Sequence, residues 1–203
     1  MSVLISNDAE LDTLLDAQEV EHICEVVLAA EGVEREVENL PLSYVDEDEM
    51  HELNHEWRGI DRTTDVLSFE CDSAFDEDIP ADETLELGDI ILVPAGHFGP
   101  SGPPAFGNSP ADECRLMLVH GMLHLLGYDH IEDDEAEVME AREDAILRDL
   151  ALERGEDPKL VHVGPHHQPR PRLGAVYDSR IEQGPSVLLK VVLLRHGGLR
   201  HRR

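Results

Sequence analysis

The chain has few of the residues that define several common classes of protein. Its 203 residues include three cysteines, Cys24, Cys71 and Cys114. Such an odd and scattered set supports neither a disulfide framework nor a four-cysteine zinc site. No apolar run approaches the ~20 residues that a membrane-spanning helix needs, and the N-terminus lacks the basic and apolar regions of a signal peptide. We therefore expect a cytoplasmic protein with no membrane partner.

Positive charge is also scarce, and it is unevenly distributed. Sixteen lysines and arginines face 45 aspartates and glutamates, which gives a formal net charge of −29. Residues 1–153 hold 6 of the basic and 41 of the acidic residues, whereas residues 154–203 hold 10 basic and 4 acidic. An acidic domain repels nucleic acid over a Debye length of ~8–10 Å, which argues against a general nucleic-acid binder. We expect one folded domain over 1–153 and a basic, mostly disordered extension over 154–203.

The apolar pattern predicts strands and helices in alternation, followed by two helices. Strand-like runs occupy residues 2–6, 33–45, 65–70 and 89–93, and helical spacing occupies 8–31, 46–57, 109–126 and 132–150. Asn7 or Asp8 would cap the first helix, which would end at Gly32. Pro41 favours an edge or a bulge for its strand. Five prolines and four glycines make residues 94–110 an irregular loop.

Three neighbouring histidines carry the clearest chemistry. His120 and His124 are four residues apart on a predicted helix, so both imidazoles project from one face about one turn apart. Gly127 can end that helix and reverse the chain, which lets His130 approach the same point. Three such ligands leave a tetrahedral Zn²⁺ with one open position, where a bound water is acidified towards a pKa of ~7. Asp129 either closes the site as a fourth ligand or orients one of the histidines.

The residue after His120 separates this site from the zinc proteases. The spacing matches the three histidines and the glycine of the H-E-x-x-H-x-x-G-x-x-H pattern. Gly121 occupies the position of the glutamate that serves those proteases as general base. The motif therefore predicts a metal site without the protease chemistry.

Three stretches of the chain resemble one family. Residues 120–130, HGMLHLLGYDH, are similar to the signature of the YbeY-type bacterial endoribonucleases, which are rRNA maturation factors. Residues 53–58 (LNHEWR) with 64–69 (TDVLSF) resemble a second motif of that family, and 87–90 (LGDI) resemble its G-D-I strand. The stretches follow the family's order and separations, so the resemblance covers about residues 1–150.

The resemblance implies both a fold and an activity. The fold would be compact and α+β, with a small mixed sheet of about four strands, packed helices and a metzincin-like three-histidine cradle at the end of a helix. One zinc ion per chain would be held by His120, His124 and His130. The enzyme would hydrolyse single-stranded RNA in 3′-end maturation of small-subunit rRNA, in the cytoplasm, with ribosomal or ribosome-associated proteins as partners and no DNA substrate. Arg58 matches an arginine that the family's activity requires, so Arg58 and His120 are the expected catalytic residues.

This chain departs from the family in two places. The family usually has a helix before the zinc helix, where this chain has the predicted loop 94–110, and the extension 154–203 lies outside the pattern. The extension either tethers RNA through its arginines or is an appendage without a role. If it has no role, a basic ribosome-associated protein would deliver the acidic domain to RNA.

The roles of several residues stay open at this stage. Arg58 would bind a phosphate in bidentate fashion or simply face the C-terminus of its helix. Asp65 either orients Arg58 or caps the turn into its strand, and we favour the structural role. Cys114 is expected to pack in the core. No metal role is expected for His97, and His166 and His167 could bind a metal weakly, with no defined partner. The alternative functions are a zinc hydrolase of peptide or amide bonds and a non-enzymatic ribosome assembly factor with structural zinc.

Overall fold

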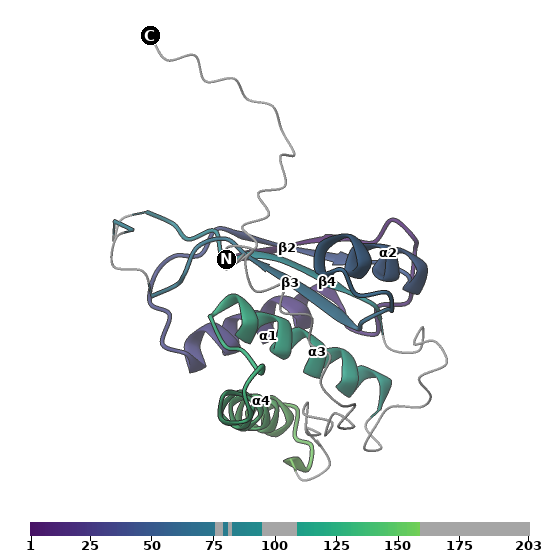
Figure 1. The fold of residues 1–203 in the computed structure, drawn as a ribbon. Coiled ribbons are helices and arrows are strands. Elements are labelled where there is room, and N and C mark those ends of the chain that lie inside the picture. Colours follow the sequence, from purple (N-terminus) through teal and green to yellow (C-terminus); the bar gives the residue numbers. More distant parts are fainter. Residues whose placement is uncertain (76–78, 81–82, 95–108, 159–203) are drawn as a thin grey trace.

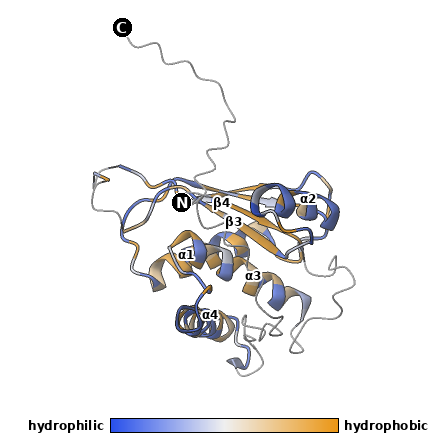
Figure 2. Cartoon of the chain, viewed as in Figure 1, coloured by the Kyte–Doolittle hydropathy of each residue, from blue (hydrophilic) through white to orange (hydrophobic). Residues whose placement is uncertain are grey.

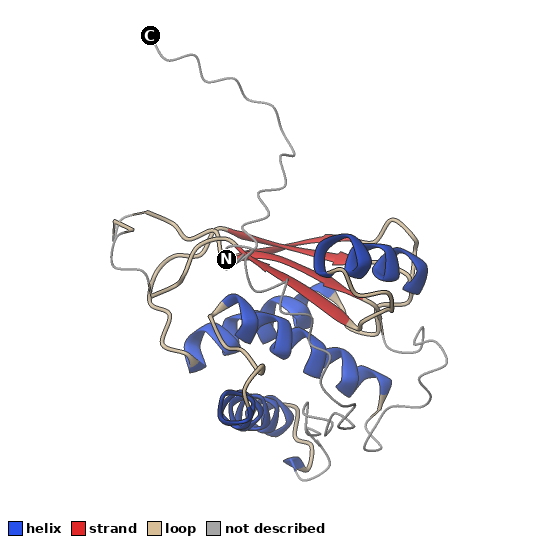
Figure 3. Ribbon diagram, viewed as in Figure 1, coloured by secondary structure: helices blue, strands red, loops and turns tan. Residues whose placement is uncertain are grey.

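The computed structural model describes residues 1–75, 79–80, 83–94 and 109–158. Most of the predicted loop 94–110 and nearly all of the extension 154–203 lie outside these residues. The described part forms a sheet and four helices (Figure 3), with the bounds β1 Ser2–Ser6, α1 Ala17–Ala30, β2 Asn39–Tyr44, α2 Glu47–Arg58, β3 Val66–Glu70, β4 Gly88–Leu92, α3 Pro110–Leu125 and α4 Asp133–Glu153.

The four strands form one mixed sheet, as the resemblance implied. The strand order is β1-β2-β4-β3, in which β1, β2 and β4 are parallel and β3 is antiparallel to β4. Pro41 lies in β2, which is an interior strand, so the prediction of an edge position was wrong. Pairing of β2 with β4 begins at Leu42, directly after the proline. The residue that lacks an N–H donor therefore precedes the stretch paired with β4, and on its other side it lies opposite Leu4 of β1.

The helices lie on both faces of this sheet, and α3 lies at the centre. Helices α1 and α3 pack on one face, α4 packs against them on the side away from the sheet, and α2 lies on the opposite face (Figure 1). The hydrophobic surfaces of α1 and α3 face the sheet and each other (Figure 2). Because α3 has the sheet on one side and α4 on the other, nine of its residues are buried.

The first helix begins later than the sequence predicted. The helix α1 starts at Ala17, where the Asp16 side chain accepts a hydrogen bond from the Glu19 backbone N–H at 2.9 Å. Asn7, the predicted cap, instead bonds to both the N–H and the carbonyl of Leu11, at 2.9 and 2.8 Å. This closes a loop rather than starting a helix, because asparagine offers the backbone a local partner that competes with the helix.

The other predicted helix starts are confirmed. Asp46 caps α2 and Ser109 caps α3, each through a side-chain oxygen that accepts the backbone N–H of the residue three positions later. Gly59 ends α2 in the left-handed region at φ 67°, a conformation that glycine adopts without strain. None of the helices in the described ranges has the length and hydropathy needed to cross a bilayer.

Candidate metal centre

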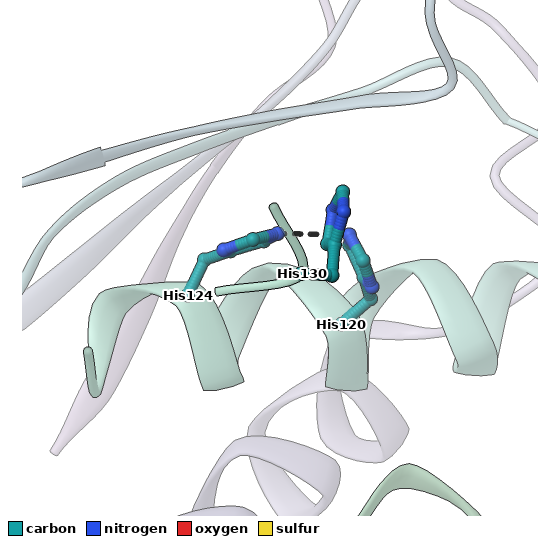
Figure 4. A group of neighbouring side chains, drawn as sticks. All are labelled: His120, His124 and His130. Carbon is teal, nitrogen blue, oxygen red and sulfur yellow. Dashed lines mark hydrogen bonds between the residues drawn. The ribbon is translucent and has the colours of Figure 1, made fainter. Parts of the chain in front are cut away.

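The structure brings the three predicted histidines together. His120 and His124 project from adjacent turns of α3, and His130 reaches the same point from the chain that follows Gly127 (Figure 4). One ligand nitrogen from each ring lies within 4.8 Å of the other two. The ring centroids are 4.5 Å apart for His120 and His124, 5.3 Å for His120 and His130, and 5.0 Å for His124 and His130.

In two of the three histidines, a hydrogen bond at Nδ1 holds the imidazole ring in position. Nδ1 of His120 lies 2.7 Å from Oε1 of Glu143 on α4, and the Glu143 side chain is fully buried. Nδ1 of His124 lies 2.9 Å from the backbone carbonyl oxygen of Tyr128. An ionised carboxylate and a carbonyl can only accept, so these contacts assign the ring proton to Nδ1 in both histidines. The Nε2 lone pairs are thereby left facing the third histidine.

The electrostatics favour a neutral ring for His124. Burial, together with the neighbouring His120 and His130, lowers the pKa of His124 from its ordinary value of 6.5 to about 4. The neutral imidazole is the form that coordinates a metal ion. At neutral pH His124 therefore presents a nitrogen lone pair rather than a charged donor.

The donor set fits a zinc ion. Two nitrogens that are each 2.0–2.1 Å from a tetrahedral zinc are about 3.3–3.4 Å apart. Nε2 of His120 and Nε2 of His124 are 3.0 Å apart, and the widest separation among the three ligand atoms stays within 4.8 Å. A cation at this point would also offset part of the negative charge of the buried Glu143 carboxylate.

Packing explains the glycine that distinguishes this motif from the proteases. Gly121 faces strands β3 and β4, on the side of α3 that touches the sheet. A Cβ at this position would lie 3.2 Å from both Cγ2 of Ile90 and Oγ of Ser68, and 3.3 Å from Cγ2 of Val66. The Ser68 hydroxyl donates to the Gly121 carbonyl at 3.2 Å. A glutamate side chain at position 121 would therefore displace the sheet from the helix.

A second set of contacts fixes the turn that carries His130. The Tyr128 hydroxyl donates to Glu31 at 2.7 Å, and Nε of Arg142 donates to the same carboxylate at 2.8 Å. The Asp129 carboxylate accepts the backbone N–H of His130 at 2.7 Å and is not part of the histidine group. Asp129 thus holds the backbone of His130, the residue that supplies the third nitrogen of the group.

The remaining predicted residues lie away from the histidines or outside the described ranges. Arg58 is exposed at the last residue of α2, which packs on the face of the sheet opposite α3. No hydrogen bond or ion pair joins Asp65 to Arg58 among the described residues, and the bond that Asp65 accepts from the Val93 N–H at 2.9 Å involves its backbone carbonyl rather than its side chain. Cys114 is 5% exposed in the core, as expected. His97, His166 and His167 fall outside the described residues.

Glu143 was not among the residues predicted from the sequence. A signal was present, because Met139, Glu143, Ile146 and Leu150 are spaced as one buried stripe of α4, and all four are buried. A charged residue in such a stripe needs a polar partner inside the protein. That partner is His120.

The comparisons with known proteins agree with this geometry. A family model described as Endoribonuclease YbeY matches residues 4–151. Endoribonuclease YbeY of an Exiguobacterium species is 36% identical over 159 residues, which cover 76% of this chain and 99% of that protein. The protein of the same name from Chloroflexus aggregans is 39% identical over 163 residues, which cover 76% and 97%.

One solved structure also matches over most of its length. The solution structure of TM1509 from Thermotoga maritima is 26% identical, covers 82% of this chain and 99% of its own, and has a TM-score of 0.46. The family model and the curated relatives carry the assignment. The chain belongs to the YbeY family of endoribonucleases, enzymes that hydrolyse phosphodiester bonds of RNA.

Proposed function

We propose that this chain is a zinc-dependent endoribonuclease that cuts single-stranded RNA during 3′-end maturation of small-subunit rRNA in the cytoplasm. The observation that carries the proposal is the group of three histidine nitrogens within 4.8 Å, formed by the motif that the family shares. The catalytic domain would comprise residues 1–153, since α4 ends at Glu153.

Each residue of the proposed site has a distinct task. His120, His124 and His130 would hold the zinc ion, and Glu143 and the Tyr128 carbonyl keep two of these rings in position. A bound zinc would supply a Lewis acid and an acidified water next to the scissile phosphate. The guanidinium of Arg58 would bind phosphate oxygens and offset the charge that develops on them.

The charge of the protein bears on how it meets its substrate. Residues 1–153 carry 41 acidic and 6 basic residues, so unspecific contacts with phosphates contribute little affinity. We therefore include ribosomal or ribosome-associated proteins in the proposal as the partners that deliver the enzyme to rRNA. DNA and membranes are not part of it.

The first test measures metal and cleavage together. Purified protein is incubated with a fluorescent single-stranded RNA, a matched duplex and casein, with and without a chelator. We expect one zinc ion per chain, cleavage of the single strand alone and loss of cleavage with the chelator. The variant His124→Ala should lose both zinc and cleavage. Full zinc content in His124→Ala would refute the metal site, and cleavage of casein but not RNA would refute the substrate class.

The second test concerns Arg58. The variant Arg58→Ala should keep its zinc and lose RNA cleavage, and Arg148→Ala serves as control because Arg148 pairs with Asp144 on α4. Cleavage by Arg58→Ala at the rate of the control would remove Arg58 from the mechanism. Full support of ribosome maturation in cells by a cleavage-deficient Arg58→Ala would instead favour an assembly factor with structural zinc.

A further inference from the structure

The arginines of the described residues divide into two groups. Five of the seven have hydrogen-bond partners on carboxylates or backbone carbonyls: Arg35 with Pro80 and Glu83, Arg115 with Glu19 and Asp112, Arg142 with Glu31, Arg148 with Asp144, and Arg154 with Glu156. The side chains of the other two, Arg58 and Arg62, have no hydrogen bond or ion pair in the described part of the chain, and both are exposed. Arg58 is the last residue of α2, and Arg62 lies four residues later in the connection from α2 to β3; residues 58–62 are called the arginine segment below.

Unpaired arginines are unexpected in so acidic a protein. With 45 acidic residues against 16 basic ones, a guanidinium on this surface has many possible carboxylate partners. The position of Arg58 has a structural explanation, because a cation at the end of α2 interacts favourably with the helix dipole. That explanation does not extend to Arg62, which lies outside the helix.

The backbone around Arg62 is held in a defined conformation. The Asn54 side chain is 1% exposed, and its Nδ2 donates to the Arg62 carbonyl at 2.6 Å. Gly59 reverses the chain after α2 with its N–H donating to the His55 carbonyl at 3.0 Å. The nearest acidic neighbour in the sequence, Asp61, lies 2.9 Å from Nε2 of His51. The segment therefore directs a charged group into solvent on an ordered backbone.

The arginine segment leads into strand β3, which contacts the helix that carries His120 and His124. Strand β3 begins at Val66, four residues after Arg62, so the two Cα atoms are at most ~14 Å apart. The side chains of Val66 and Ser68 lie against Gly121, the residue that follows His120. Contacts through β3 therefore join the arginine segment to the helix that carries His120 and His124, while α2 lies on the other face of the sheet.

We propose that Arg62 is a second phosphate-binding residue, which together with Arg58 binds the backbone of the single-stranded RNA that is cut at the three histidines. This inference rests on the proposed function and extends it from one arginine to a two-arginine segment. A guanidinium binds phosphate oxygens through paired N–H donors, and contacts to phosphate fix the register of a strand without selecting its sequence.

Salt-dependent binding tests the proposal. The full chain with its metal is titrated into a fluorescent single-stranded RNA whose 2′-hydroxyls are methylated, and anisotropy is measured over a series of KCl concentrations. Each phosphate contact to a single strand contributes about −0.7 to the slope of log K against log salt. We expect Arg62→Gln to reduce the magnitude of the slope by about 0.7, Arg62→Lys to restore it, and Arg148→Gln to leave it unchanged. Arg148→Gln removes the same charge from a residue that already has a carboxylate partner.

The outcomes separate this inference from the proposed function. A slope for Arg62→Gln equal to that of Arg148→Gln, with wild-type cleavage of RNA intact, would overturn the inference alone. Equal weakening by both variants would show a general charge effect and would overturn it as well. Absence of RNA binding and cleavage in the wild type would overturn the proposed function and the inference together. Thermal unfolding of each variant confirms that the fold is retained.

Discussion

The contact between Glu143 and His120 predicts that a residue with no access to the substrate controls the affinity for metal. The variant Glu143→Gln keeps a hydrogen-bond acceptor at 2.7 Å from Nδ1 but removes the negative charge from a fully buried position. A carboxylate behind a metal-binding histidine fixes the ring and raises its basicity, and its loss typically lowers metal affinity about 10–100-fold. We expect the same range here, which corresponds to about 1.4–2.8 kcal/mol.

Competition with a chromophoric zinc chelator at fixed pH measures this affinity directly. The matched control is Glu137→Gln, which removes the same charge from an exposed position of the same helix. The extra thermal stability that zinc gives the wild type should shrink in Glu143→Gln by a comparable free energy. Equal zinc affinity in the two variants would refute the argument, because only Glu143 contacts a histidine of the site.

Three further predictions follow from the packing, the turn and the metal centre. Gly121→Ala should lower the free energy of unfolding by up to about 2 kcal/mol, since overpacking costs about 1–3 kcal/mol and alanine regains about 1 kcal/mol in the helix; a raised urea midpoint would contradict this. Tyr128→Phe should lower the free energy of unfolding by about 1.5–3 kcal/mol, because it removes the hydrogen bond to the Glu31 carboxylate. An unchanged urea midpoint would show that Arg142 alone holds that carboxylate. A chain ending at Gly155 should retain its zinc and its metal-dependent stability, as measured by metal analysis and thermal unfolding with and without chelator. Loss of zinc on truncation would show that the extension takes part in the site.

The metal centre was predictable because its information is local. His120 and His124 share a helix face by their spacing, and Gly127 reverses the chain so that His130 can join them. The starts of α2 and α3 likewise agree with the predicted ranges 46–57 and 109–126, because a side chain and a backbone N–H three residues apart determine each one. Neither feature needs knowledge of distant segments.

Two of the errors arose where distant segments decide the structure, and one arose from a local contact. The neighbours of Pro41 depend on sheet order, which the sequence pattern of a single strand does not contain. Asn7 has a residue type that caps helices, yet its bonds to Leu11 close a loop instead. Glu143 lies 23 residues from His120, so its role depends on how α4 docks onto α3. A charged residue on a buried stripe is the pattern that would have singled it out.

Because Glu143 lies in α4, the metal site is completed only after its three histidines have been synthesised. All three histidines have left the ribosome once residue 130 is exposed, but the carboxylate behind His120 belongs to the last helix of the domain. A nascent chain that ends before α4 would hold the ligands on a helix with one side uncovered, and we expect it to bind zinc weakly. Tight metal binding would then coincide with completion of the domain, so a partly synthesised enzyme would have little hydrolytic capacity while still attached to the ribosome.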